Sequence, residues 1–513
     1  MQTRIRYLFT NFSSLKDNRV QVFFLVFFIL INLILLMSAK PKSVQTSLFG
    51  DTYMLHPAYS QASDGQRYWG AALSLAERGQ FLIRSDQHII EHHNSVEDSL
   101  KPLSRAGPLP AILFAVPIKL FGFSNAIFFI VAGQCFLLWL MSLATRGIAE
   151  PFKANKNLAQ ALVLFNPNLI GIAHHAQSDL IFAAILTFLL LEISKLIDRP
   201  SLASLKNAAL IALLAGLLPL ARPMGAYCIF LLPFFLFFSL LVRQRFIRID
   251  WRKISALGAL ATAVTLIILT PWAVRNHAVF GDFGLTQSGA IQAQYYYRAL
   301  KPYGLPDSTP AVINYLEKHG YDPSCLNSGE PGSGCEKAIR NAYMNLILKA
   351  PKTILAQVQI TAAIRTLLSG GTRTITDYIG LEPPSEQYDQ LMKYNSTTLS
   401  RFLKNIYDVN PTYLILFILI TAFPFITRGI GLIGLIRAIS NPRCHAHLLF
   451  HLLIISLLLL LYGLQGWSRF RVPIEPILMV FTAIAFANLG QRETVVSRDS
   501  KRPRLDDNKK INL

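Results

Sequence analysis

The stretch VQVFFLVFFILINLILLMSA, residues 20–39, decides the fold class of this chain. It contains no charged residue, and about 20 predominantly apolar residues are what an α-helix needs to cross a bilayer. Basic residues precede it, at Arg4, Arg6, Lys16 and Arg19. Because the stretch is longer than the roughly 7–15 apolar residues of a signal-peptide core, it predicts an uncleaved anchor. Its basic flank, residues 1–19, is then expected in the cytoplasm.

Nine further apolar runs follow, at 123–145, 157–174, 179–197, 206–221, 224–242, 254–272, 411–427, 447–464 and 474–490. Ten spans place both chain ends on the cytoplasmic side, and basic residues gather in the linkers that this topology puts inside. The sequence therefore predicts an all-α polytopic domain over residues 20–490, followed by a basic cytoplasmic tail, 491–513. The segment 354–368 carries polar residues and is expected to be interfacial.

The composition agrees with a membrane protein. The chain has 513 residues, of which 52% are hydrophobic and 15% are charged, whereas soluble domains carry about 25% charged residues. Its hydrophobicity excludes an intrinsically disordered chain. The 49 Lys and Arg against 29 Asp and Glu give a net charge of +20. We attribute this excess to the positive-inside rule rather than to nucleic-acid binding.

Two long polar stretches, residues 40–106 and 273–409, fall on the same outer side of the membrane in this topology. Transporters commonly have internal repeats, and none is found here, so large one-sided loops favour chemistry at the outer surface. Cys325 and Cys335 bracket a Gly- and Ser-rich segment of the second stretch. They form a disulfide outside the cell or are two unrelated loop cysteines, and both readings stay open.

The first outer loop contains a short amphipathic helix over residues 63–79. Ser63 with Gln66 three positions later fits a capping box, and Gly79 provides the stop. Its apolar face, which includes Tyr68, is expected to lie flat on the membrane. Asp64 then lies at the helix start, at the boundary between water and lipid. A carboxylate there either caps the helix or accepts a proton from an incoming hydroxyl.

Several short motifs follow in an order that resembles the polytopic GT-C glycosyltransferases, in particular the protein-mannosyltransferase-like bacterial branch, which is similar to glycosyltransferase family 39. They lie between predicted spans from the first outer loop to the last span: Asp64-Gly65 with Tyr68, Arg105-x-x-Pro108, Asn166-Pro167, Ser178-Asp179-Leu180, Leu220-Ala-Arg222-Pro223, Thr270-Pro-Trp-Ala-Val-Arg275-Asn276 and Arg469-Phe-Arg471-Val-Pro473. Residues 295–409 match this pattern poorly. Gly65 stands where some members carry a second carboxylate, which favours a single acidic catalyst.

The resemblance implies a sugar donor linked to a polyprenyl phosphate, of which undecaprenyl phosphate is the bacterial form. The acceptor is then an envelope glycan, lipid or protein on the periplasmic face of the inner membrane. A leaving phosphate needs fixed positive charge, which the planar fork of Arg supplies well. The arginines expected at outer span ends are Arg105, Arg222, Arg275, Arg469 and Arg471. The alternative for each is snorkelling or pairing with Asp179, Asp282 or Glu475.

Asp64 is the candidate general base in a displacement that inverts the anomeric carbon. Tyr68, Asp179 and His175 are candidates for a supporting or acceptor-binding role, with a helix cap or an ion pair as the favoured reading of Asp179. No cofactor is predicted. Adjacent histidines point about 100° apart on a helix, so a divalent metal at His174 and His175 is not expected. The alternative functions are an O-antigen polymerase or ligase and a transporter or flippase.

Overall fold

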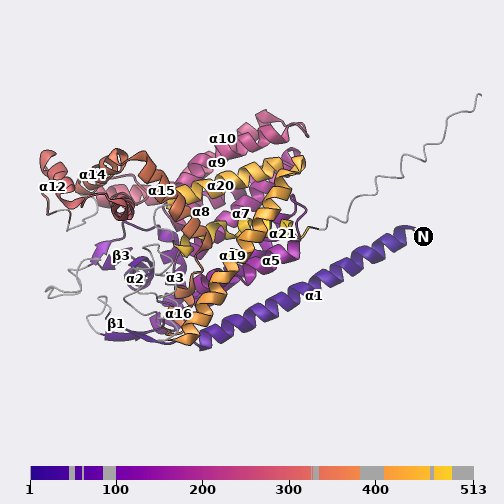
Figure 1. Cartoon of the computed structure of the whole chain (residues 1–513), viewed down its shortest axis with the longest axis horizontal. Helices are drawn as coiled ribbons and strands as arrows, with labels where there is room; N and C mark the ends of the chain where they lie inside the picture. The colour runs from indigo at the N-terminus through magenta and orange to yellow at the C-terminus, as the bar shows by residue number, and fades with distance from the viewer. Residues whose placement is uncertain are drawn as a thin grey trace, which may run out of the picture.

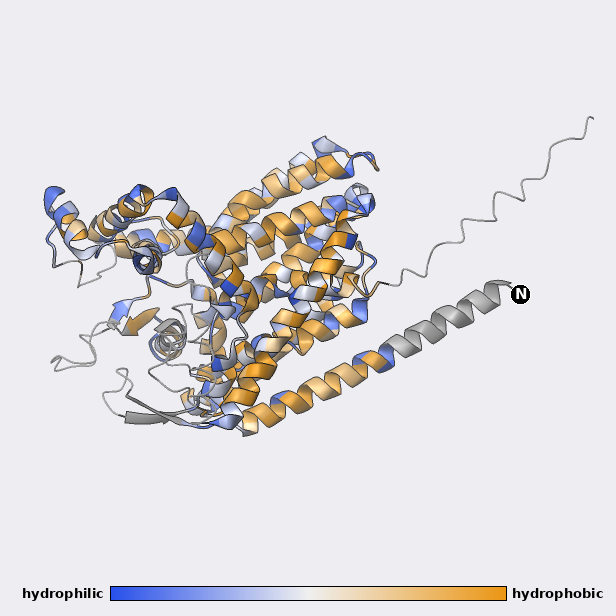
Figure 2. Cartoon of the chain, in the orientation of Figure 1, coloured by the Kyte–Doolittle hydropathy of each residue, from blue (hydrophilic) through white to orange (hydrophobic). Residues whose placement is uncertain are grey.

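The computed structural model describes residues 2–45, 52–59, 63–84, 100–324, 326, 334–381, 410–462 and 467–487. Seven helices within these ranges are long and apolar enough to cross a membrane, and their described residues are mostly hydrophobic in Figure 2. They are α1 (Gln2–Met37), α4 (Phe123–Ala149), α7 (Asp179–Asp198), α9 (Gly225–Arg243), α10 (Trp251–Phe280), α19 (Pro411–Ile439) and α20 (His445–Tyr462). The predicted all-α polytopic fold is confirmed.

Three of the ten expected spans take shorter forms. Residues 206–221 form α8 (Leu205–Ala221), an apolar helix of 17 residues. The last expected span begins with a 3₁₀ segment, η5 (Ser468–Ile474), and continues as α21 (Glu475–Ile484). The expected interfacial segment is α15 (Lys352–Leu368), which is not among the candidate spans.

The third expected span, 157–174, is divided into α5 (Lys156–Leu164) and α6 (Pro167–Ala173). Asn166 causes the break, because the residue before a proline is disfavoured in the α region. Its side chain accepts hydrogen bonds from the N–H groups of Asn168 and Leu169, at 3.0 and 3.4 Å. It thereby caps α6, and Pro167 fills the first helical position.

The interior of the bundle is built around α7, which packs against α4, α8, α9, α20 and η5. Nearly every side chain of its first two turns is buried. In contrast, α1 and α10 lie at the periphery, and only 11% and 6% of their most apolar windows are buried. Their exposed Phe, Leu and Ile side chains suit contact with lipid chains. The buried α7 therefore provides the rigid base on which the polar outer elements rest.

The elements of the two outer loops gather at one end of the bundle, on the left of Figure 1. The first outer loop contributes two antiparallel hairpins and one helix: β1 (Lys42–Gln45), β2 (Thr52–Leu55), α2 (Ser63–Arg78), β3 (Leu82–Arg84) and β4 (Leu100–Pro102). The apolar helix α3 (Pro108–Phe121) follows directly. From the second come helices: α11 (Gly289–Leu300), α12 (Thr309–Lys318), α14 (Gly334–Lys349) and α16 (Thr372–Tyr378). In register, Lys42 pairs with Leu55 and Leu82 with Pro102. Among the described residues there are also short 3₁₀ turns: η2 (Pro200–Leu202), η3 (Lys301–Tyr303) and η4 (Pro442–Cys444).

Candidate functional site

The helix expected over residues 63–79 is present as α2, and it ends at Gly79, whose φ of +70° is the left-handed conformation that glycine adopts readily. Its apolar face packs on α3, so the expectation that it lies on lipid was wrong. Tyr68 and Trp69 are 6% and 1% exposed. The physical reason is that α3 offers its own buried residues, Phe114 among them, as a protein partner.

Asp64 lies in the first turn of α2, and its side chain lies outside what the structure describes. The chain just before α2 is held firmly. The carbonyl of Ala58 accepts a hydrogen bond from the N–H of Ala176 at 2.8 Å. The Tyr59 ring stacks on Phe123 at 4.5 Å, and its hydroxyl donates to the Phe123 carbonyl at 2.6 Å. The start of α2 is thereby fixed near the outer ends of α4 and α7.

Asp179 and Arg222 form an ion pair at this end of the bundle. Asp179 occupies the first turn of α7, where the helix dipole favours a negative charge. Arg222 follows the last residue of α8. Their side chains are 3% and 11% exposed. The pair matches the favoured reading of Asp179, and the charge of Arg222 is compensated by a carboxylate.

Arg275 joins α10 to the first outer loop. It donates to the carbonyl of Leu103 at 2.7 Å and to that of Phe81 at 3.4 Å. Its guanidinium lies over the rings of Trp272 and Phe280, 4.7 and 5.2 Å from their centroids. These partners carry no net charge, so the local environment of Arg275 stays positive.

Arg105 lies on a segment that contacts both Arg275 and the end of α8 that precedes Arg222. Two residues before it, Leu103 accepts the hydrogen bond from Arg275. Two residues after it, Gly107 lies so close to α8 that an added Cβ would stand 2.2 Å from the carbonyl oxygen of Leu220. Only glycine fits this approach. The segments of Arg105, Arg222 and Arg275, far apart in the sequence, therefore converge.

Arg469 and Arg471 belong to a second corner, at η5. Arg471 is 1% exposed; it pairs with Glu475 and donates to the carbonyls of Thr366, Leu367 and Ser369 at 2.8, 3.1 and 2.6 Å. It thus caps the C-terminal end of α15. Arg428 binds the other oxygen of the same carboxylate at 2.7 Å, a partner that the sequence did not identify.

Arg469 points elsewhere, over the rings of Trp467 and Phe470 at 5.5 and 5.2 Å. Its segment is tied to α6 through Ser468, whose carbonyl accepts from the Asn168 amide at 3.2 Å. Of the two arginines in this motif, Arg471 is buried in an ion pair with Glu475, whereas Arg469 lies over aromatic rings.

His175 is buried and donates through Nε2 to the carbonyl of Thr374 at 2.8 Å. Its ring and those of His56 and His174 surround Tyr378, with centroid distances of 5.1 to 5.8 Å. Burial and the two neighbouring histidines lower the pKa of His56 to about 4, so it is neutral at pH 7. No group of three metal-ligating side chains occurs among the residues with a described position.

Two further residues of the outer loops bear on the site. Cys335 is disulfide-bonded, and Cys325, its predicted partner, lies outside the described residues. Beside Cys335, Glu336 has both carboxylate oxygens buried. Burial raises the pKa of Glu336 to about 7 against the opposing charges of Arg105 and Arg340. Nothing in the local sequence marks this glutamate, because its surroundings come from distant segments.

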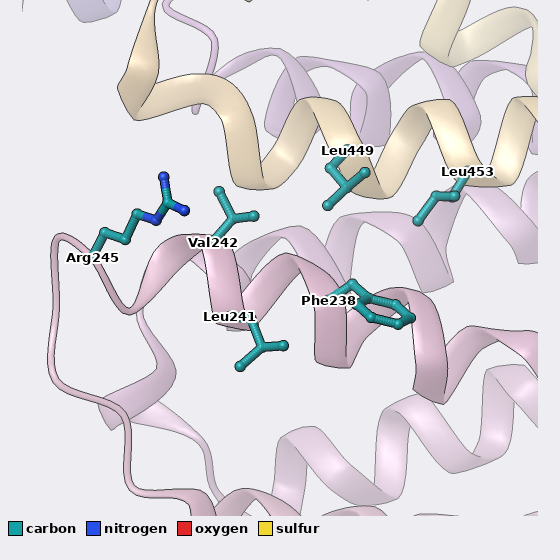
Figure 3. Close-up of a pocket in the computed structure, with 6 residues that line it drawn as sticks. All are labelled: Phe238, Leu241, Val242, Arg245, Leu449 and Leu453. Atoms are coloured by element: carbon teal, nitrogen blue, oxygen red, sulfur yellow. The ribbon is translucent and has the colours of Figure 1, made fainter.

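A groove of about 320 Å³ lies at the opposite end of α9 from Arg222, between α9 and α20 (Figure 3). Its walls are Phe238, Leu241, Val242, Leu449 and Leu453, with Arg245 at the rim. A 19-residue helix is about 28 Å long, so this groove is roughly one hydrocarbon thickness away from the arginines described above. It is therefore separate from the candidate site.

Comparison with known proteins gives structural likeness and no sequence match. No protein-family model matches the chain, and no curated protein matches it. Two crystal structures of the Archaeoglobus fulgidus oligosaccharyltransferase are similar to this chain. The structure with Zn and sulfate has a TM-score of 0.43 and 13% identity, over 90% of this chain and 48% of that one. The apo structure has a TM-score of 0.45 and 12% identity, over 91% of this chain and 50% of that one. ArnT from Cupriavidus metallidurans in the apo state is also similar, with a TM-score of 0.34 and 16% identity over 89% of this chain and 77% of that one. The chain spans about half the length of the oligosaccharyltransferase, and at these identities the activities of these proteins are not transferred to it.

Proposed function

We propose that this chain is an inverting membrane glycosyltransferase that moves a sugar from a polyprenyl-phosphate-sugar donor to an envelope acceptor on the periplasmic face. The observation that carries the proposal is the convergence of the Arg105, Arg222 and Arg275 segments at the end of an apolar bundle, where α2 with Asp64 also begins. The order of motifs that resembles the GT-C glycosyltransferases supports the same reading.

The donor has two parts that need different surroundings. Its polyprenyl tail is apolar and belongs in lipid, against helices such as α10 whose side chains are mostly exposed. Its phosphate is anionic and belongs at the polar end of the bundle. Arg275 lies at this junction, because it follows the apolar part of α10 and contacts the first outer loop. A donor bound in this way places its anomeric carbon above the membrane surface, near the start of α2.

The transfer is a single displacement. The acceptor hydroxyl oxygen forms a bond to the anomeric carbon from the face opposite the phosphate, and Asp64 accepts the hydroxyl proton. The bond between the anomeric carbon and the phosphate oxygen breaks, and its electron pair leaves with polyprenyl phosphate. Fixed positive charge from Arg105 and Arg275 stabilises the charge that develops on that oxygen. One displacement inverts the configuration at the anomeric carbon.

The test measures polyprenyl phosphate released by purified protein from a panel of undecaprenyl-phosphate sugars with crude envelope acceptors. We expect release by the wild-type protein and a fall of about 10²–10⁴-fold in Asp64→Asn, the contribution typical of a positioned base. Glu77→Gln is the matched control, because Glu77 is an exposed carboxylate on the same helix.

Each outcome separates the alternatives. Equal release by wild type and Asp64→Asn would show that Asp64 only caps α2. Undecaprenyl-diphosphate-linked sugars form a second donor panel, and release of polyprenyl diphosphate from it, with none from the monophosphate panel, would favour the polymerase or ligase reading. Folded protein that releases neither product from any donor would contradict the proposed function and favour transport.

A further inference from the structure

Asn276 lies beside Arg275 in α10, and it is 1% exposed. Its Oδ1 accepts a hydrogen bond from Nη1 of Arg275 at 2.9 Å, and its Nδ2 donates one to the carbonyl of Gly284 at 2.7 Å. A guanidinium only donates and a carbonyl only accepts, so the opposite orientation of the amide would lose both bonds. The side chain of Asn276 is therefore fixed with its oxygen toward Arg275.

The turn after α10 presents the Gly284 carbonyl to Asn276, and two further hydrogen bonds anchor this turn. Nε1 of Trp272 donates to the carbonyl of Leu285 at 3.1 Å. The N–H of Gly284 donates to the carboxylate of Asp282 at 3.1 Å. The partner of Asn276 is thus held in place by contacts that do not involve Asn276 itself.

The partners of Arg275 occupy three of its five N–H groups. Nη1 uses both of its N–H groups, on the carbonyl of Leu103 at 2.7 Å and on Asn276 at 2.9 Å. Nη2 uses one, on the carbonyl of Phe81 at 3.4 Å. Within the described part of the chain, the Nε–H and the second N–H of Nη2 donate no hydrogen bond. Two donors in one plane suit the bidentate binding of a phosphate.

Asn276 also adds no charge beside Arg275. Arg222, in contrast, is paired with the buried carboxylate of Asp179. A carboxylate has nearly the shape of an amide, but in place of Asn276 it would form an ion pair with Arg275 and turn an acceptor oxygen toward the Gly284 carbonyl. An amide therefore satisfies both neighbours of this position, and an ionised carboxylate does not.

We propose that Asn276 is a positioning residue that orients Arg275 for the donor phosphate without neutralising it. Together with Leu103, Asn276 occupies both N–H groups of Nη1, so that the remaining donors of Arg275 are directed at the phosphate. The proposal rests on the proposed function, because Arg275 is assigned there to the leaving phosphate. It deepens that function by naming the residue that sets the orientation of this arginine.

The experiment measures kcat/KM for the undecaprenyl-phosphate sugar that the wild-type protein uses, as release of polyprenyl phosphate. Asn276→Ala keeps the charge of Arg275 and loses its orientation, and we expect a fall of about tenfold, as for a lost hydrogen bond to a charged group. Asn276→Asp places a negative charge beside the phosphate, and we expect a fall of about 10²-fold at pH 8. Because Asn276 acts through Arg275, the double variant Asn276→Ala/Arg275→Ala has the kcat/KM of Arg275→Ala alone.

A pH series separates the orientation of Arg275 from an effect on folding. When the carboxyl group introduced by Asn276→Asp is protonated, its carbonyl oxygen accepts from Arg275 and its O–H donates to Gly284, as the amide does. Burial and the facing carbonyl favour this neutral form, against the charge of Arg275. The activity of Asn276→Asp relative to wild type should therefore rise severalfold from pH 8 to pH 5, and that of Asn276→Ala should stay constant. Asp282, on the same turn, is present in every variant and cancels in the ratio.

Asn314→Asp is the control, because Asn314 is an exposed asparagine of the large outer loop, and it should keep the wild-type kcat/KM. Unfolding midpoints show whether each variant is folded. If Asn276→Asp does not fold, the double variant decides the question, since additive effects of Asn276→Ala and Arg275→Ala overturn the inference and equal values support it.

The possible failures are distinguishable. Wild-type activity in folded Asn276→Asp overturns the inference and leaves the proposed function intact. Equal losses in Asn276→Asp and Asn276→Ala at every pH also overturn it, because they mean that Asn276 only holds the turn after α10. No release by the wild-type protein overturns the proposed function and the inference together.

Discussion

The arginines at the junctions of the bundle and those that hold the outer loops are compensated in different ways. At the α7–α8 and η5–α21 junctions, Arg222 and Arg471 are paired with buried carboxylates. In the outer loops, Arg275 contacts backbone carbonyls and aromatic rings. The first arrangement cancels charge inside the protein, whereas the second surrounds the cation with neutral groups. Identical residue types at similar helix ends therefore differ in their partners, and the proposed function assigns the donor phosphate to the second arrangement.

The largest effect expected concerns the η5–α21 junction. Glu475→Gln leaves Arg471 buried without its counter-charge and removes the partner of Arg428. Breaking a buried ion pair costs about 3–5 kcal/mol, so the unfolding midpoint in detergent, followed by circular dichroism, should fall strongly. The control is Asp377→Asn, which removes an exposed pair with Arg373 and should change stability by about 0.5 kcal/mol or less. Similar unfolding midpoints in Glu475→Gln and Asp377→Asn would show that the buried ion pair of Arg471 contributes no more to stability than an exposed pair.

Arg275 tests the outer-loop side of the comparison. Arg275→Lys keeps the positive charge and loses the planar fork that holds the carbonyls of Leu103 and Phe81. We expect release of polyprenyl phosphate to fall about 10²-fold, at the lower end of the loss when one transition-state donor is removed. The unfolding midpoint should stay near that of wild type. If Arg275→Lys loses stability and keeps its turnover number, Arg275 stabilises the fold and does not act on the donor.

The third prediction concerns the pH dependence of stability. The pKa of Glu336 is raised from 4.5 to about 7 by burial, so the folded protein binds this proton more tightly than the unfolded chain does. Its contribution to stability falls as the pH rises from about 4.5 through 7, and is constant above. Glu336→Gln should remove this slope from the unfolding midpoints measured between pH 5 and 8. An identical slope in both proteins would show that the carboxyl titrates in its ordinary range.

Local patterns in the sequence predicted most of the bundle. Seven of the ten expected spans are candidate membrane helices in the part of the chain that is described, because a long apolar run has few other ways to satisfy its backbone. The break at Asn166-Pro167 was visible in the sequence, since an Asn cap followed by Pro is a helix start. Treating 157–174 as one span gave too much weight to hydropathy.

The outer loops were harder to predict. The helix at 63–78 was recognisable from its cap, its amphipathic face and Gly79. The orientation of this helix could not be predicted, because an apolar face packs equally well on lipid and on a neighbouring helix. In the structure, it packs on α3. Glu336 and Arg428 carried no local signal at all. Their roles depend on residues more than 40 positions away.

By itself, the sequence determined most of the long apolar helices, which of their ends carry arginine, and where α2 begins, beside Asp64. These properties follow from hydropathy, charge and capping, which act over a few neighbouring residues. Only the tertiary structure decided which arginines pair with buried carboxylates, as Arg222 and Arg471 do, and which contact backbone carbonyls and aromatic rings, as Arg275 does. That outcome depends on partners supplied by other helices and loops, and on a low-dielectric interior in which the presence or absence of one carboxylate determines the local charge.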